Sequence, residues 1–89
     1  MRSDLKELKE KRRSIDLLDQ KLLTLLNRRL RVATEIGKIK KEIGKKICDP
    51  RREKEVLEGL ARKNKGPLKK EDLKKIFGMI MKACRKSQI

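Results

Sequence analysis

The chain has 89 residues, enough for one small domain and close to the lower limit for a single hydrophobic core. It carries 28 lysines and arginines against 13 aspartates and glutamates, a formal net charge of +15, and it has no histidine, tryptophan or tyrosine. The missing histidine excludes imidazole as a metal ligand or a general base. The positive net charge favours an anionic partner, such as nucleic acid, an anionic membrane or a small anionic ligand.

Neither the cysteines nor the apolar residues indicate export or membrane insertion. Cys48 and Cys84 are too few and too far apart for a disulfide framework or a zinc site, so we expect two reduced thiols. No stretch approaches the roughly 18 apolar residues of a membrane span. The N-terminal residues lack the apolar core of a signal peptide. We therefore expect a cytoplasmic protein with no membrane partner.

The first predicted element is a helix from Asp4 to Ile43, a stretch without proline. Gly44 and the basic residues before it predict its end, and the isolated Gly37 inside it suggests that another segment approaches its backbone closely. A helix of about 40 residues is about 60 Å long. The rest of the chain is too short to cover such a rod, so the sequence predicts a helical dimer in which two long helices bury each other.

Two shorter helices follow. The second is expected to begin at Asp49 and Pro50, an N-cap followed by proline in the first turn, and to end near Lys63. A break at Gly66 separates it from a third helix, for which apolar residues at helical spacing predict the range Leu68 to Ser87. Because no β-alternation is present, the predicted fold class is all-α, with three helices per chain, one of them very long.

One face of the first helix mixes apolar and charged residues. A helix–helix seam favours apolar side chains, because a buried unpaired charge is costly. Arg12, Arg29 and Lys40 therefore either face solvent or hold an anionic group, and we favour the second interpretation. The face recurs every three or four residues and comprises Leu8, Arg12, Ile15, Asp19, Leu22, Leu26, Arg29, Ala33, Ile36, Lys40 and Ile43.

The spacing of the three cations predicts a site shared between two chains. Arg29 and Lys40 are about 16 Å apart along the axis, a span that two long side chains can bracket around a small ligand. Arg12 lies about 25 Å from Arg29 and cannot join it from the same straight helix. If two first helices cross antiparallel, Arg12 of one chain falls beside the interval between Arg29 and Lys40 of the other. Three cations around one pocket require a ligand with more than one negative charge.

Two further groups add to this pattern. The segment CDPRRE, residues 48–53, sets backbone amides, Arg52 and Glu53 at a helix N-terminus, where the helix dipole favours anions. Glu53 alone is better explained as a first-turn partner of that dipole than as a ligand contact. Near the C-terminus, Cys84 and Gln88 share one helix face, and the simplest interpretation is a core thiol and a frayed surface amide.

Together these residues resemble the all-helical class of chorismate mutases. The resemblance covers essentially the whole chain, so we expect one chorismate mutase domain over residues 1–89, either free-standing or part of a larger fusion. It implies an intertwined antiparallel homodimer with two active sites. The matching segments, in order, are Ile15-Asp16-x-x-Asp19, Leu22-Leu23-x-Leu25-Leu26-Asn27-Arg28-Arg29, Ile36-Gly37-x-x-Lys40, Ile47-x-Asp49-Pro50-x-Arg52-Glu53, Asn64-x-Gly66-Pro67-Leu68, Ile76-Phe77 and Ala83-Cys84-Arg85-x-x-Gln88.

The resemblance also implies a reaction and its main contacts. The reaction is the intramolecular Claisen rearrangement of chorismate to prephenate in phenylalanine and tyrosine biosynthesis. Arg29 and Arg12 of the partner subunit would bind the two substrate carboxylates. Lys40 and Gln88 would hydrogen-bond the ether oxygen as it gains negative charge. A pericyclic rearrangement needs no nucleophile or proton transfer, so the resemblance implies no cofactor and no metal.

The remaining contacts lie in the second and third helices. The resemblance implies that Glu53 and the backbone at Asp49 hold the ring hydroxyl, and that Arg52 helps to orient Glu53 and lines the site. Cys84 would line the carboxylate pocket. Its position is often serine in relatives, and a thiol is the weaker hydrogen-bond donor.

Two other functions fit parts of the pattern. An isochorismate–pyruvate lyase on the same scaffold also binds a dicarboxylate enolpyruvyl ether, although Asp49, Arg52, Glu53 and the terminal Gln88 favour the mutase. A nucleic-acid-binding helical dimer would explain the net charge. Against it, the basic residues are scattered over all three helices, with no aromatic stacking platform and no recognition-helix signature.

Overall fold

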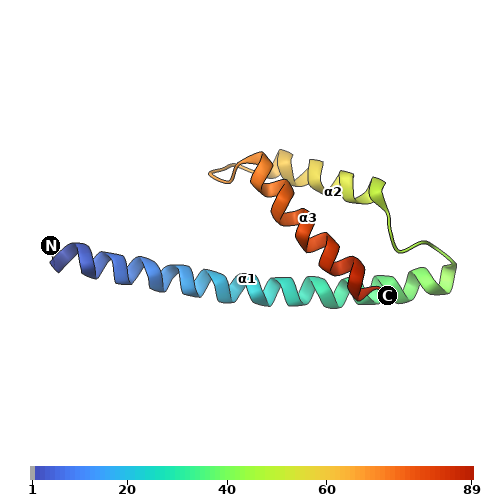
Figure 1. The fold of residues 1–89 in the computed structure, drawn as a ribbon, viewed down its shortest axis with the longest axis horizontal. Coiled ribbons are helices and arrows are strands. Elements are labelled where there is room, and N and C mark those ends of the chain that lie inside the picture. Colours follow the sequence, from blue (N-terminus) through green and yellow to red (C-terminus); the bar gives the residue numbers. More distant parts are fainter. Residues whose placement is uncertain (1) are drawn as a thin grey trace.

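The computed structural model describes residues 2–89, and these form three α-helices with no strand (Figure 1). Helix α1 spans Arg2–Ile43, α2 spans Pro50–Lys63 and α3 spans Lys70–Ser87. The predicted all-α class is therefore confirmed. Within the described range, no helix is long and apolar enough to cross a membrane.

Helix α1 has the predicted length and the predicted end. It contains 42 residues, and the longest dimension of the chain is 62 Å. At its C-terminus Gly44 adopts a φ of 72°, which glycine tolerates because it has no Cβ. The Gly44 N–H donates to the Lys41 carbonyl, and the Lys45 N–H donates to the Lys40 carbonyl at 2.8 Å. These two bonds form a Schellman motif, which ends the helix and turns the chain toward α2.

Helix α3 begins two residues later than predicted, at Lys70 instead of Leu68. The side chain of Asn64 explains the difference, because its Nδ2 donates to the Leu68 carbonyl at 2.7 Å and its Oδ1 accepts from the Gly66 N–H at 2.9 Å. The loop between α2 and α3 is held by this one side chain. The first backbone bond of the new helix then runs from the Leu73 N–H to the Lys69 carbonyl.

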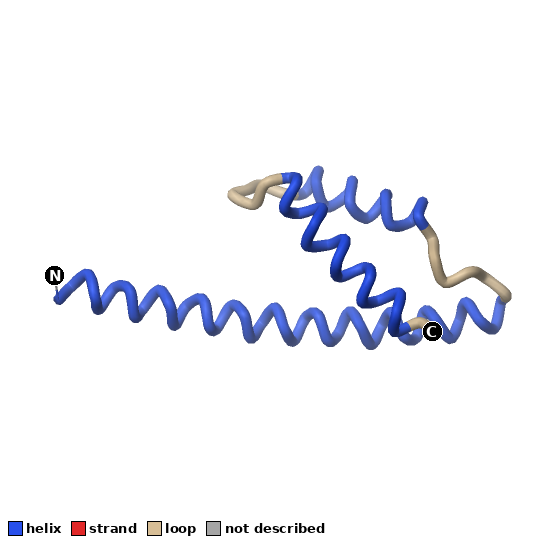
Figure 2. Tube along the Cα trace, in the orientation of Figure 1, coloured by secondary structure: helices blue, strands red, loops and turns tan. Residues whose placement is uncertain are grey.

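Helix α3 holds the other two helices together. It packs against both α1 and α2, whereas α1 and α2 make no direct helix–helix contact in the described chain. Figure 2 shows α2 and α3 on one side of α1, over its C-terminal half only, joined to it by an extended loop. The buried core is correspondingly small, and α2 contributes no buried residue to it. The core side chains are Ala33, Leu73, Met81 and Cys84.

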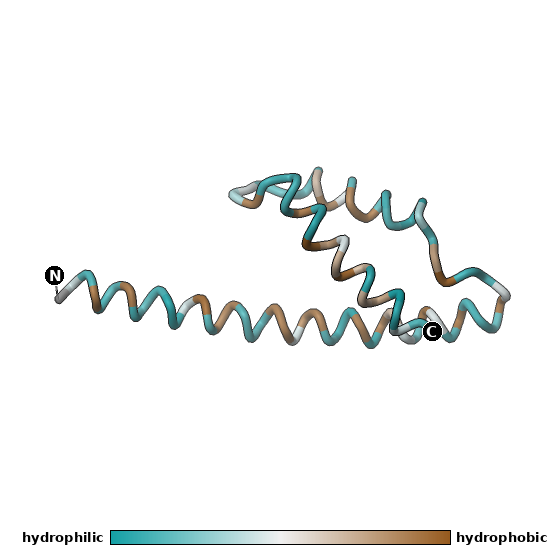
Figure 3. The backbone as a smooth tube through the Cα atoms, viewed as in Figure 1, coloured by the Kyte–Doolittle hydropathy of each residue, from teal (hydrophilic) through white to brown (hydrophobic). Residues whose placement is uncertain are grey.

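The N-terminal half of α1 is uncovered and apolar. Its large aliphatic side chains are between 40% and 63% exposed. In Figure 3 apolar segments recur along the part of α1 that α2 and α3 leave free. This confirms the expectation that the rest of the chain cannot cover the long helix. The exposed residues before the covered half are Leu5, Leu8, Ile15, Leu17, Leu18, Leu22, Leu23, Leu25 and Leu26.

Gly37 is the point where the end of α3 meets α1. A Cβ at Gly37 would lie 2.8 Å from both Cα and Cβ of Gln88, closer than side chains tolerate. The predicted close approach to this glycine is therefore confirmed. Only a glycine allows the last turn of α3 to lie against the backbone of α1.

We expect Gly37→Ala to be about 1–3 kcal/mol less stable than the matched variant Gly59→Ala. Both substitutions gain similar intrinsic helix propensity, but a Cβ at Gly59 meets only Arg62 Nη2, at 3.9 Å. The difference in unfolding free energy, measured in urea, therefore isolates the contact with Gln88. Equal stability of the two variants would contradict this packing.

Candidate active site

A cavity of about 350 Å³ lies between the C-terminal half of α1, the loop before α2, the first turns of α2 and the last turns of α3. Its size suits a small organic ligand. The apolar part of its lining is Val32, Ala33, Ile36, Ile47, Val56 and Met81. The polar part is Arg29, Lys40, Asp49, Arg52, Glu53, Cys84, Arg85 and Gln88.

Seven of the eight predicted site residues line this one cavity, and Arg12 is the exception. The predicted face of α1 is turned toward it, since Arg29, Ala33, Ile36 and Lys40 all contribute to the wall. The charges that interrupt the apolar face therefore point into a cavity in this part of the helix.

Lys40 connects three parts of the site. Its Nζ donates to the Ile47 carbonyl at 2.8 Å and to Gln88 Oε1 at 3.3 Å. The ammonium group has three N–H donors, so one remains for a ligand. Gln88 is half-buried and is the C-cap of α3, so the interpretation of this residue as a frayed surface amide is wrong. The contact with Lys40 and the packing on Gly37 hold it in place.

Arg29 and Cys84 meet at the other end of the cavity. Arg29 Nη1 donates to Cys84 Sγ at 2.8 Å. Cys84 is 6% exposed, which confirms its prediction as a core thiol, and it also lines the cavity. The thiol fixes one nitrogen of the guanidinium, while four further N–H donors of Arg29 remain for other acceptors.

The start of α2 is fixed by Asp49. Its Oδ1 accepts from the Arg52 N–H at 3.1 Å, and its carbonyl accepts from the Glu53 N–H at 3.1 Å. Pro50 follows in the first turn, as predicted. The cap and the first helical bond together place Glu53 at the wall of the cavity.

Glu53 is held by Arg85, a residue for which the sequence predicted no role. Arg85 Nη1 donates to Glu53 Oε2, and the two side chains are 34% and 28% exposed. Arg52, expected to orient Glu53, also lines the cavity, but its charged partner is Glu55, whose Oε2 lies 3.9 Å from Arg52 Nη1. The hydrogen bond with Glu53, and then its charge, raise the pKa of Arg85 above its ordinary value despite the opposing effect of burial.

The position of Arg85 did carry a signal in the sequence. It lies three residues before Gln88 and one after Cys84, so all three share one face of a helix. The sequence could not identify its partner, because the pairing with Glu53 depends on how α3 crosses α2.

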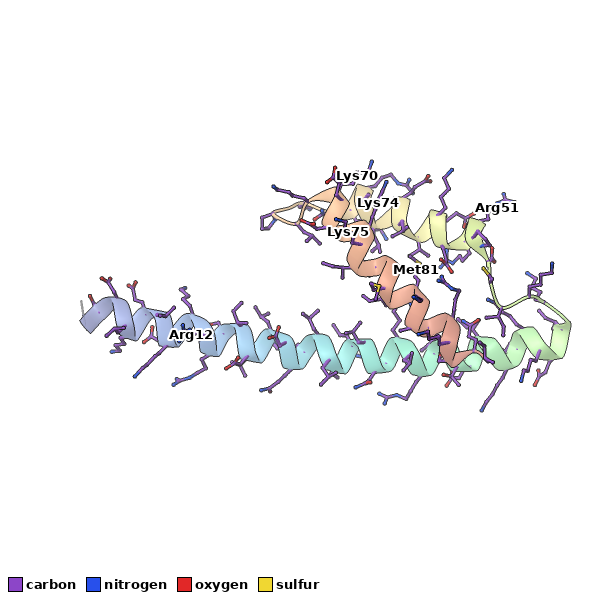
Figure 4. The ribbon with its side chains drawn as sticks, in the orientation of Figure 1. Arg12, Arg51, Lys70, Lys74, Lys75 and Met81 are labelled. Atoms are coloured by element: carbon purple, nitrogen blue, oxygen red, sulfur yellow. The ribbon has the colours of Figure 1, made fainter. Side chains whose placement is uncertain are left out.

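Arg12 is far from the cavity within one chain. Figure 4 shows it on the uncovered half of α1, well away from α2 and α3. This agrees with the expectation that Arg12 cannot join Arg29 from the same straight helix. Arg12 itself is exposed.

The sequence profile of the chorismate mutase type II family matches residues 11–89. The chain belongs to this family. It is 40% identical to the bifunctional chorismate mutase/prephenate dehydratase of Aquifex aeolicus over 84 residues, 90% of this chain and 23% of that protein. It is 37% identical to the protein of the same description from Pseudomonas aeruginosa over 87 residues, 92% of this chain and 24% of that one. The chain thus spans about a quarter of the length of these curated relatives.

Solved structures agree with membership of the chorismate mutase type II family. The chain superposes on a chorismate mutase (form II) from Thermus thermophilus with a TM-score of 0.90 and 34% identity, over 92% of this chain and 93% of that one. It also matches a conserved hypothetical protein from Pyrococcus furiosus, with a TM-score of 0.77 and 35% identity, over 92% and 95% of the two chains. These likenesses cover the three-helix fold almost completely.

The capping role of Asp49 can be separated from its charge. We expect Asp49→Ala to lower the unfolding free energy by about 1 kcal/mol, because the first turn of α2 loses its side-chain acceptor. Asp49→Asn keeps an oxygen at that position and should stay within a few tenths of a kcal/mol of the parent chain. Urea unfolding followed by circular dichroism measures both. An equal loss in the two variants would assign the effect to charge instead of capping.

Proposed function

We propose that the chain is a chorismate mutase that converts chorismate to prephenate by an intramolecular Claisen rearrangement. The observation that carries the proposal is one cavity, which brings together Arg29 and Lys40 of α1, Glu53 of α2 and the C-cap of α3, Gln88. Membership of the chorismate mutase type II family supports it. The similarity to two bifunctional chorismate mutase/prephenate dehydratases and to a solved chorismate mutase structure supports it further.

The chemistry asks for positioning and charge stabilisation. One C–O bond breaks while one C–C bond forms within the same molecule, so no atoms are exchanged with the protein. The site must hold the extended substrate in a folded reactive conformation. It must also aim hydrogen-bond donors at the ether oxygen, which gains negative charge in the transition state.

The charge of the cavity suits a substrate with two carboxylates. Four cationic and two carboxylate side chains line it, which leaves a net charge of +2 from one chain. Arg29 is the proposed carboxylate ligand, because its planar guanidinium donates through two parallel N–H groups. Cys84 fixes one nitrogen of that group, so the guanidinium is oriented before substrate binds.

Lys40 and Gln88 are the proposed donors to the ether oxygen. Lysine can only donate, so its bond to Gln88 Oε1 requires the amide oxygen to face Lys40. The amide nitrogen of Gln88 is then the group left to donate to a ligand. One N–H of Lys40 remains as well, and the two groups supply a pair of fixed donors on the same side of the cavity.

Glu53 is the proposed acceptor for the ring hydroxyl of the substrate, with the backbone at Asp49 as a second contact. Its Oε2 accepts from Arg85, which leaves Oε1 for a hydroxyl donor. Arg52 lines the cavity beside it and adds positive charge.

The proposed enzyme is a homodimer in which Arg12 of the partner subunit completes each site. The exposed apolar face along the first half of α1 supports a second copy as its cover, because a face of this length is unfavourable in water. An antiparallel crossing of two α1 helices brings the two faces together and creates two equivalent sites. We place the enzyme in the cytoplasm, in phenylalanine and tyrosine biosynthesis.

The first test is incubation of the purified chain with chorismate and chromatographic identification of the product. We expect prephenate, and we expect Lys40→Ala to reduce kcat by at least about 100-fold, because a donor to the transition-state oxygen is lost. Lys38→Ala, an exposed position of α1 outside the cavity, is the matched control and should retain full activity. Unchanged chorismate with the parent chain would overturn the proposed function. Near-normal turnover in Lys40→Ala would remove this residue from the mechanism.

The contribution of Arg12 from the partner subunit predicts complementation. Arg12→Ala and Lys40→Ala are each expected to be nearly inactive alone. When equal amounts of the two variants are refolded together, about half of the dimers contain one chain of each. Each mixed dimer has one intact site of two, so about a quarter of the parent activity should return. Arg29→Ala mixed with Lys40→Ala is the control and should recover nothing, because each intact site needs both residues from one chain. No recovery in the first mixture would show that Arg12 is not supplied across the dimer.

A further inference from the structure

Arg85 and Glu53 form an ion pair between two helices at the wall of the cavity. Both side chains line the cavity and are about one-third exposed. The other ion pairs of residues 2–89, Arg51 with Glu55 and Arg52 with Glu55, lie within α2 and are mostly exposed. The pair of Arg85 and Glu53 is therefore the one that joins α3 to α2, and it does so at the candidate active site.

The other nearby cations are engaged elsewhere. Arg52 faces Glu55, and Lys40 donates to the Ile47 carbonyl and to Gln88. Arg85 is the cation that contacts Glu53. Because Asp49 caps α2 and fixes its first turn, the backbone of Glu53 is set by α2 while the direction of its carboxylate is set by Arg85.

An unpaired carboxylate at this position would oppose the binding of a dianion. Like charges in a partly desolvated site repel more strongly than in water. Removing Arg85 from this partly buried ion pair leaves the charge of Glu53 without its counter-charge at the wall of the cavity. A counter-charge on Glu53 therefore lowers the electrostatic cost of binding a dianion whose hydroxyl donates to this carboxylate.

We propose that Arg85 is a positioning residue for the rearrangement, which balances the charge of Glu53 and directs one carboxylate oxygen toward the substrate hydroxyl. This inference rests on the proposed function. Arg85 acts through Glu53, so its effect must depend on the charge of Glu53, and this dependence separates it from a purely structural role.

The test compares steady-state kinetics with chorismate for four chains: the parent, Arg85→Met, Glu53→Gln and the double variant. We expect Arg85→Met to raise KM about tenfold with a smaller change in kcat, because the dianion is bound more weakly in both the ground state and the transition state. Adding Glu53→Gln to Arg85→Met should lower KM again, because the neutral amide accepts from the hydroxyl without repelling the substrate. Arg85→Lys should raise KM less than Arg85→Met, since it keeps the charge but loses the planar fork.

Lys82→Met is the matched control, because it removes one positive charge from an exposed position of α3 outside the cavity, and its KM should equal that of the parent. Circular dichroism confirms that each variant is folded, and Arg85→Gln replaces Arg85→Met if the latter is not. If the parent is active and Arg85→Met has the same KM as the parent, the inference about Arg85 fails while the proposed function stands. The inference also fails if the KM increases of Arg85→Met and Glu53→Gln multiply in the double variant, since that indicates independent roles. A parent chain that leaves chorismate unchanged overturns the proposed function and this inference together.

Discussion

The contact between the last turn of α3 and the backbone of α1 governs the rest of the structure. Gln88 lies against Gly37 and accepts a hydrogen bond from Lys40, so the C-terminal end of α3 is fixed on α1. Because α1 and α2 do not pack directly against each other, α3 is the element that determines where α2 lies. The cavity is the space that this arrangement leaves between the three helices, and its polar groups belong to the segments that meet there.

Within the cavity, each charged group is oriented by a neighbour before any ligand binds. Cys84 contacts Arg29, the Ile47 carbonyl contacts Lys40, and Arg85 contacts Glu53. These contacts use some of the donors and acceptors and leave others free. For a reaction that requires orientation and charge stabilisation, such preorganised groups are effective because they need not rearrange as charge develops. The net charge of +15 acts over a longer range and favours the approach of anions.

The small core explains why a second copy matters for the proposed enzyme. In the part of the chain whose burial the structure describes, residues 3–89, only four side chains are buried, and the aliphatic face of the first half of α1 contributes none of them. In the proposed dimer this face becomes the main buried surface, and the same crossing carries Arg12 to the site of the partner subunit. Stability and catalysis would then depend on one interface, which links folding of the chain to completion of its sites.

The sequence by itself determined the three helices, their breaks, the face of α1 that carries Arg29 and Lys40, and the place of most site residues. These features follow from periodicity, capping and turn residues, which act over a few neighbouring positions. Only the tertiary structure decided which charges pair. Arg85 holds Glu53, Arg52 turns to Glu55, and Gln88 is fixed beside Lys40. Such partners lie 30 or more residues apart or compete within one turn, and the crossing of α3 over α1 and α2 selects between them.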